Sequence, residues 1–187
     1  NTMRLKRLPS PSELEITSKV GNGSVRVRAI GVIPASVQTK HLELEAPVKD
    51  SKVQADPDQD LVKIAVFERH TGTGNRGLGF IKGLGIKEDM LTAMKTLAES
   101  QGGLVVVRNR KVLAHLPLPI GGLMSDETVE NVSEKIERIR EAWTELGSNL
   151  PSPYMTLSFT TLSVIPELRI TDKGLLDTVQ FTFVPLI

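Results

Sequence analysis

The chain has 187 residues, 40% of them hydrophobic, and its 23 basic and 22 acidic residues give a net charge of +1 at neutral pH. This balance excludes a strong overall field that would attract nucleic acid or an anionic membrane surface. The lack of cysteine excludes disulfides and thiolate chemistry, and no apolar run approaches the roughly 20 residues that a membrane helix needs. We expect a soluble, cytoplasmic chain forming one domain over residues 1–187.

The first part of the chain has the pattern of β-strands. Residues 21–24, Gly-Asn-Gly-Ser, suit the tight turn of a hairpin between two β-rich runs. Pro57 lies in an acidic turn that precedes the most apolar strand. The predicted strands here are residues 14–20, 25–32, 41–45 and 61–68.

Two helices are predicted from apolar residues that recur at spacings of three and four. Residues 88–101 form the first, with glycines at 102 and 103 as a stop signal. Residues 126–146 form the second, with acidic residues in its first turn and Gly147 after it. Trp143 lies in the apolar stripe of the second helix, so we interpret it as a core residue.

Further strands surround these helices. Pro117 and Pro119 close one run and place it at a sheet edge, because proline cannot donate to a strand ladder. The remaining predicted strands are residues 104–107, 112–116, 155–163, 167–171 and 178–184. Strands that arrive mainly as hairpins, with two long helices between them, indicate an α+β fold: a largely antiparallel mixed sheet with flanking helices, in layers.

A glycine-rich stretch over residues 72–85 follows the most apolar strand. Gly72, Gly74 and Gly77 satisfy the G-x-G-x-x-G spacing of dinucleotide-binding loops. Such a loop must open a helix, whereas three more glycines follow at 79, 83 and 85, which disfavours a nucleotide cofactor. Two interpretations stay open: a flexible surface loop, or a loop whose backbone approaches a ligand or a neighbouring domain closely.

Polar residues at the base of this stretch are the candidate site. Glu68 and His70 could supply a general acid or base, and Arg69 an anion-binding group. Strand alternation places Glu68 and His70 on one side and Arg69 on the other, so a surface ion pair is the competing interpretation.

The residue types exclude several other kinds of site. His41 and His115 are isolated in strand contexts and show no metal-ligand spacing, so no metal site is predicted within this chain. No serine has the sequence context of an activated nucleophile. Seven aromatic residues, not interleaved with basic ones, give no support for a nucleic-acid surface.

Several segments in fixed order resemble the C-terminal domain of bacterial and archaeal adenine deaminases of the amidohydrolase superfamily. They are GVIP at 31–34, TKHL at 39–42, AVFERH at 65–70, GTGN at 72–75, GLGF at 77–80, GGLVV at 102–106, LPLPIGGLMS at 116–125, MTLSF at 155–159, VIPEL at 164–168 and TDKGL at 171–175. The resemblance spans nearly the whole chain.

The resemblance implies a purine-salvage hydrolase that converts adenine to hypoxanthine and ammonia in the cytoplasm. It implies manganese or iron held by an N-terminal barrel domain as the partner of this chain, and a homo-oligomer. This chain alone would then be inactive, with Glu68, Arg69, His70, Thr71 and Asn75 at the substrate mouth or the domain interface. The alternative is a non-catalytic assembly or ligand-binding domain.

The sequence differs from the family pattern near Lys87 and Glu88. There family members carry a further stretch of residues that includes histidines, between the glycine-rich stretch and the first helix. The sequence here runs straight on. Either this stretch was deleted from the protein, or a loop that the protein has is missing from the sequence given, and we favour the missing loop.

Overall fold

The computed structural model describes residues 5–68, 72–84 and 89–187, and it divides into two compact units. The first unit takes the described residues of 1–9, 68–74 and 86–149, and the second those of 10–67, 75–85 and 150–187. The chain therefore passes between the units several times. Each unit is described by itself, and their assignment to one domain stays a prediction.

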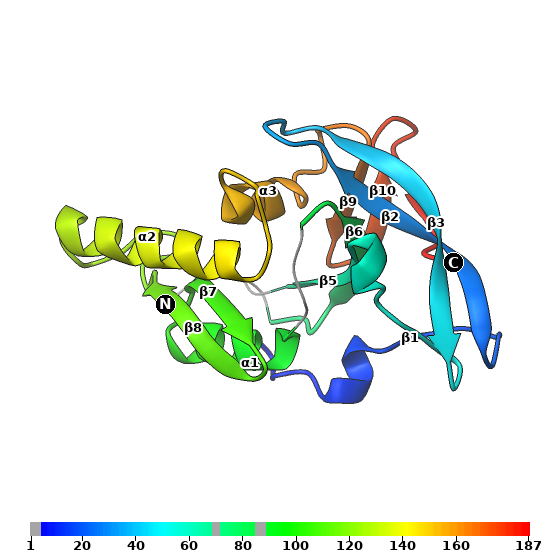
Figure 1. The fold of residues 1–187 in the computed structure, drawn as a ribbon, viewed down its shortest axis with the longest axis horizontal. Coiled ribbons are helices and arrows are strands. Elements are labelled where there is room, and N and C mark those ends of the chain that lie inside the picture. Colours follow the sequence, from blue (N-terminus) through cyan, green and yellow to red (C-terminus); the bar gives the residue numbers. More distant parts are fainter. Residues whose placement is uncertain (1–4, 69–71, 85–88) are drawn as a thin grey trace. The chain divides into compact units, whose positions relative to one another are not determined.

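The second unit is built on a six-stranded mixed sheet in the order β1-β4-β3-β2-β6-β5 (Figure 1). Its strands are β1 (Ile16–Thr17), β2 (Gly23–Val32), β3 (Thr39–Lys49), β4 (Lys52–Val53), β5 (Leu61–Phe67) and β6 (Arg76–Lys82). β2 and β6 are parallel, and all other neighbours are antiparallel. Short 3-10 helices η1 (Pro11–Leu14) and η2 (Pro57–Gln59) precede β1 and β5, the second at the predicted proline turn.

The long β2–β3 pair shows the expected alternation of side chains. Val27 and Ala29 on β2 and Ala46 on β3 are buried in the core. On the opposite side, two cross-strand ion pairs lie partly in solvent, Arg26 with Glu45 at 3.8 Å and Arg28 with Glu43 at 3.5 Å. Exposed pairs of this kind add little stability, so burial of the apolar face holds the strands together.

The predicted hairpin between residues 14–20 and 25–32 is wrong. β1 pairs with β4, and β2 pairs with β3 over ten residues. The residues of the predicted turn instead bond to the next turn, where Ser51 N donates to Gly21 O at 2.7 Å and Asp50 N to Asn22 Oδ1 at 3.0 Å. The long β2–β3 ladder forms more backbone hydrogen bonds than the short local hairpin would, so it prevails.

The glycine-rich stretch is also not simply a loop, because residues 76–82 form β6 between β5 and β2. A Cβ atom on Gly77 would lie 1.9 Å from the carbonyl oxygen of Thr171, and one on Gly79 would lie 3.1 Å from the Leu175 side chain. The glycines thus permit a close approach of a segment from the same unit, whereas the second interpretation predicted the approach of a ligand or a neighbouring domain. The approaching group belongs to this chain and is not a ligand.

The approaching segment is a three-stranded antiparallel sheet in the order β11-β10-β9. Its strands are β9 (Leu168–Thr171), β10 (Gly174–Asp177) and β11 (Thr182–Val184). The sequence predicted β9. It predicted one strand over residues 178–184, of which only the last part forms β11, and it missed β10.

The strand predicted over residues 155–163 is wrong, because α3 (Pro153–Phe159) is a helix. Pro153 stands in its first turn, where a fixed φ favours a helix start. The alternating hydroxyl residues that imitated a strand bond back along the helix, Thr156 Oγ1 to Ser152 O at 3.1 Å and Ser158 Oγ to Tyr154 O at 3.0 Å.

The first unit places two helices on a two-stranded sheet (Figure 1). α1 (Met90–Glu99) and α2 (Val129–Glu145) both contact the antiparallel hairpin of β7 (Gly103–Arg108) and β8 (Lys111–Pro117). All four elements follow the sequence predictions, and β8 ends at Pro117 on an edge as expected. The buried side chains of this unit include Val106, Leu116, Ile139 and Trp143.

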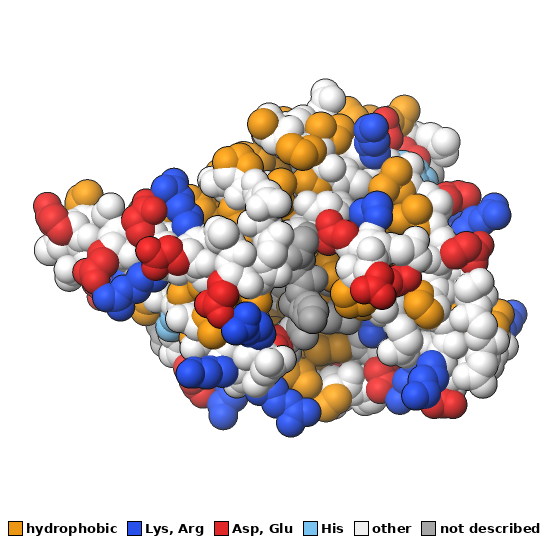
Figure 2. Space-filling model, viewed as in Figure 1, with side chains coloured by type: hydrophobic (Ala, Val, Ile, Leu, Met, Phe, Trp, Pro, Cys, Tyr) orange, Lys and Arg blue, Asp and Glu red, His pale blue; other side chains and the backbone are white. Residues whose placement is uncertain are grey.

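The outer face of α2 is charged. Figure 2 shows acidic and basic side chains alternating over this helix, and the ion pairs Glu134–Arg138 and Glu137–Arg140 follow helical spacing. Trp143 is buried, so its interpretation as a core residue is confirmed. Among the helices that the structure describes, none combines the length and hydropathy needed to cross a membrane.

The predicted fold class is confirmed. The described chain combines a largely antiparallel six-stranded mixed sheet, two smaller sheets and three α-helices, which is an α+β fold.

Candidate functional site

The candidate site at the end of β5 is described only in part. Glu68 Oε2 accepts hydrogen bonds from Thr73 N at 3.0 Å and from Thr73 Oγ1 at 3.3 Å. This carboxylate therefore fixes the start of the glycine-rich stretch within the first unit. Arg69, His70 and Thr71 lie outside the described residues, so their predicted roles stay predictions.

Asn75 belongs to the second unit, and its Nδ2 donates to Asp172 Oδ2 at 3.5 Å. Asp172 lies in the turn between β9 and β10, so this long contact joins the start of β6 to the same hairpin that covers Gly77 and Gly79. Glu68 and Asn75 each bond within their own unit.

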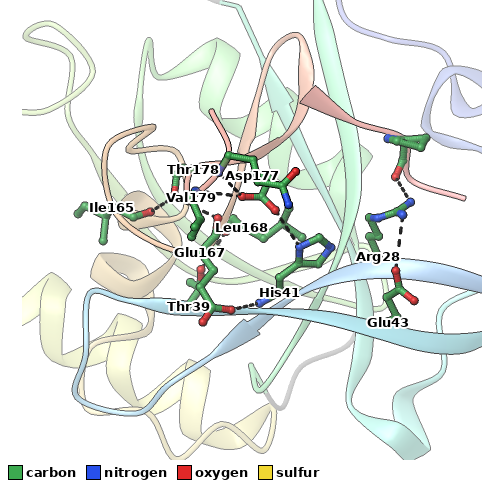
Figure 3. Close-up of polar contacts among 12 residues, drawn as sticks. Arg28, Thr39, His41, Glu43, Ile165, Glu167, Leu168, Asp177, Thr178 and Val179 are labelled. Atoms are coloured by element: carbon green, nitrogen blue, oxygen red, sulfur yellow. Dashed lines mark hydrogen bonds and ion pairs between the residues drawn. The ribbon is translucent and has the colours of Figure 1, made fainter. Parts of the chain in front are cut away.

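The structure brings together a second polar group that the sequence did not predict (Figure 3). His41 on β3 lies with its Nδ1 atom 3.3 Å from Asp177 Oδ2 at the end of β10. The backbone amide of His41 also donates to Glu167 Oε2 at 2.8 Å. His41, which the sequence shows only as isolated in a strand without metal-ligand spacing, thus has two acidic partners in the fold. Its partners lie more than 120 residues away in the sequence, and no local pattern indicates them.

The protonation of this pair follows from its contacts. Backbone amides of Gln180 and Val179 each donate to Asp177 Oδ1 at 2.9 Å. These bonds, first that of Gln180 and then that of Val179, together with His41, lower the pKa of Asp177 and outweigh the opposing effect of its burial. An ionised carboxylate only accepts, so Nδ1 of His41 carries the hydrogen. The buried Nε2 atom of His41 meets no hydrogen-bond partner among the described residues.

Buried hydroxyl groups join the same strands. Thr39 Oγ1 donates to Leu168 O at 2.9 Å, and Thr178 Oγ1 lies 3.1 Å from Ile165 O and 3.0 Å from Glu167 O (Figure 3). The cluster of His41, Asp177 and these threonines thus fastens β3 to the β9–β10 hairpin. We interpret it as a structural junction.

Arg169 on β9 is the largest fully buried side chain of the second unit. Its guanidinium donates to four backbone carbonyl oxygens, those of Ile165 at 2.6 Å, Phe159 at 3.1 Å, Val37 at 2.7 Å and Pro166 at 2.9 Å. Burial lowers the pKa of Arg169 from its usual value, but the carbonyl dipoles replace the lost water. The side chain holds together the end of α3 and the loop between β2 and β3.

The first unit contains a serine–histidine contact, with Ser100 Oγ 3.1 Å from His115 Nε2. The same hydroxyl lies 3.0 Å from Thr96 O and 2.9 Å from Gly102 O. Because the backbone takes the single hydroxyl hydrogen, His115 acts as the donor, so it does not activate Ser100 as a nucleophile. Burial, and then the positive charge of Lys135, lower the pKa of His115, so this ring is neutral at pH 7.

The hydrogen bonds of His41, Arg169 and Ser100 hold segments of the chain together, and none of them forms a catalytic arrangement. In residues 5–68, 72–84 and 89–187, no group of three histidine or acidic side chains is arranged to hold a metal ion. The fold and these contacts define an α+β protein of two compact units with structural polar junctions.

Comparison with known proteins identifies its family. The family described as adenine deaminase C-terminal domain matches residues 36–89 and 86–182. The chain belongs to this family, which the sequence resemblance had indicated. The match includes residues of both units.

Curated relatives agree along the whole chain. The chain is 43% identical to an adenine deaminase of Moorella thermoacetica over 209 aligned residues, covering all of this chain and 35% of the relative. It is 40% identical to one of Clostridium botulinum over 208 residues, again covering all of this chain and 35% of the relative. With one of Oleidesulfovibrio alaskensis the identity is 45%, over 89% of this chain and 33% of the relative. The chain thus spans about a third of the length of these relatives.

Proposed function

We propose that this chain forms the C-terminal domain of an enzyme that hydrolyses adenine to hypoxanthine and ammonia in purine salvage. The observation that carries the proposal is the match of the whole chain to relatives named adenine deaminase, at 40% identity or more. Hydrolysis replaces the amino group of adenine by the oxygen of water, and the amino group leaves as ammonia.

The metal of such an enzyme is proposed to lie in the N-terminal barrel that the resemblance implies, with manganese or iron as the ion. The described residues of this chain do not fit a metal centre, because no three ligating side chains come together. No catalytic step is therefore assigned to them. Cytoplasmic location and a homo-oligomeric enzyme belong to the same proposal.

The proposed contribution of this chain is to complete the substrate mouth or the domain interface. Glu68, Arg69, His70, Thr71 and Asn75 remain the candidates for this role. Support comes from Glu68, which directly follows β5 and accepts a hydrogen bond from Thr73, and from Asn75, which directly precedes β6 and donates one to Asp172.

A chimera tests the proposal. This chain replaces the matching third of the Moorella relative, and hypoxanthine release from adenine is measured with manganese or iron present. We expect the chimera to turn over adenine, and both the isolated chain and the truncated relative to match the metal-only blank. A folded but inactive chimera, or turnover by the isolated chain, would contradict the proposal. The first of these outcomes would favour a non-catalytic assembly or ligand-binding domain.

His70 gives a sharper test in the same chimera. We expect His70→Ala to lower kcat/KM at least about tenfold, the low end of what a positioned acid, base or substrate contact contributes. His41→Gln is the matched control, because Asp177 holds His41 in a structural junction. If His70→Ala leaves both kcat and KM unchanged, its role at the substrate mouth is wrong.

A further inference from the structure

A tight turn in the first unit presents large apolar side chains to solvent. The turn, residues 120–124, follows β8, and we call it the apolar tip. Within it Leu123 is 71% exposed, Met124 60% and Ile120 46%, and Val129 at the start of α2 is 80% exposed. Single exposed apolar residues are common, but four so close in sequence are not.

The apolar tip is held by backbone hydrogen bonds. Ile120 N donates to Met124 O and Met124 N to Ile120 O, each at 3.1 Å. Gly121 and Gly122 adopt φ values of 65° and 75°, the left-handed conformation that a side chain would disfavour. The turn is therefore a defined structure that displays its side chains, and the exposure of Leu123 does not result from a lack of local order.

The tip is also anchored to the rest of the first unit. A Cβ atom on Gly102 would lie 2.3 Å from Cα of Gly122, so the two backbones are in close contact. Leu118 N donates to Gly102 O at 3.1 Å just before the tip. A preformed apolar surface binds a partner with little loss of conformational entropy.

The surroundings of the tip are polar. Asp126 and Glu127 follow the tip in sequence, Glu130 lies in the first turn of α2, and Figure 2 shows the charged side chains of this helix. An apolar centre beside charged residues has the composition of a protein–protein contact, with a dry core and a polar rim.

We propose that the apolar tip, with Val129, docks against the remaining two-thirds of the adenine deaminase polypeptide; this inference rests on the proposed function. In a relative matched by its C-terminal domain, the rest of the chain precedes the matched part. It would join this chain at its N-terminal end, where the described residues 5–9 belong to the same unit as the tip. A partner in the same polypeptide is present at high effective concentration, so a small apolar contact suffices.

Oxidation of methionine by hydrogen peroxide tests the inference without any need for activity. Mass spectrometry measures the oxidation rates of Met124 in the tip and of Met155 on α3, which is 41% exposed. Both rates are compared between the isolated chain and the Moorella chimera. We expect the chimera to slow oxidation of Met124 at least about tenfold while Met155 changes little, because oxidation follows exposure. Equal rates for Met124 in both proteins, or equal slowing at both methionines, would overturn the inference.

Two variants of the chimera give matched tests with the same reporter. Leu123→Asp places a charge in the proposed contact, so we expect Met124 to oxidise at the rate of the isolated chain, within about twofold. Val164→Asp changes a side chain 77% exposed in the second unit and should leave Met124 protected. Loss of protection by Val164→Asp, or none by Leu123→Asp, contradicts the proposal.

Three further outcomes separate this inference from its alternatives. If Met124 in the isolated chain becomes protected as its concentration rises, a second copy occupies the tip, and the proposal is wrong. If the chimera protects Met124 but does not deaminate adenine, the docking surface stands and the proposed function fails. An active chimera with unprotected Met124 retains the function and rejects the docking surface.

Discussion

Arg169 is a buried cation whose hydrogen-bond partners are all backbone carbonyl oxygens. Replacing it by methionine keeps much of the volume but leaves four acceptors without their donor. We expect Arg169→Met to lower the free energy of unfolding by about 3 kcal/mol, since each unsatisfied buried group costs about 1–3 kcal/mol and the loops can partly rehydrate. Urea unfolding of the variant and the unchanged chain measures this difference in free energy. Arg26→Met, on the exposed face of β2, should change stability by less than about 0.5 kcal/mol, and equal effects would refute the role of Arg169.

Asp177 links stability to pH. Its pKa is lowered in the folded chain, chiefly by the amide hydrogen bonds of Gln180 and Val179. The stabilisation is therefore complete well above the unfolded-chain value of about 3.9 and is lost as the pH falls through the lower folded pKa. We expect Asp177→Asn to show a shallower fall of unfolding free energy below about pH 5 than the unchanged chain. Asp58→Asn, on the exposed η2, serves as control, and identical pH profiles for Asp177→Asn and the unchanged chain would contradict the assignment.

His115 adds a second pH dependence in the first unit. Burial and Lys135 lower its pKa, so the unfolded chain binds the proton more readily than the folded chain does. The stability that neutral His115 contributes is thus present above the unfolded-chain pKa of about 6.5 and is lost as the pH falls through the lower folded pKa. We expect His115→Gln to reduce the loss of stability as the pH falls below about 6.5. Unfolding is followed by the fluorescence of Trp143. If the unfolding free energy of the variant falls with pH as steeply as that of the unchanged chain, protonation of His115 is not the cause of the loss.

At the scale of elements, β6 depends on its glycines. The Cβ atom of Gly77→Ala would meet Thr171 O at 1.9 Å and Gly174 N at 3.1 Å, both backbone atoms that cannot rotate away. The β9–β10 hairpin must then move off β6, and we expect a loss of about 3 kcal/mol, the upper range for overpacking. Gly21→Ala is the matched control, because its Cβ atom would meet nothing within 4 Å. Thermal unfolding compares the two, and equal Tm values would show that the close approach is not needed.

At the scale of the whole molecule, the chain offers one spectroscopic reporter in each unit. Trp143 is its single tryptophan and lies in the first unit, and Tyr154 is its single tyrosine and lies in the second. Ile139 is buried one turn before Trp143 on α2. We expect Ile139→Ala to lower the stability reported by Trp143 fluorescence by about 3 kcal/mol through the cavity it leaves. Val129→Ala, exposed on the same helix, should leave the unfolding midpoint within error; a midpoint unchanged by Ile139→Ala would mean that this core relaxes to fill the space.

The sequence by itself determined the elements whose signals are local. The helical spacing around Met90 and Val129 and the turn between β7 and β8 were predicted because each depends on residues within a few positions. The α+β class and the family also followed from the sequence, through the mixture of elements and the order of motifs. Tertiary structure alone decided the pairing of β1 with β4, the strand β6 and the helix α3. These features depend on which arrangement buries the apolar faces and pairs the backbone groups at the same time, as in the close approach of Gly77 to Thr171. The junction of His41 with Asp177 and the bonds of Arg169 were likewise decided only by folding, because their partners are distant in sequence and no local pattern encodes a contact between them.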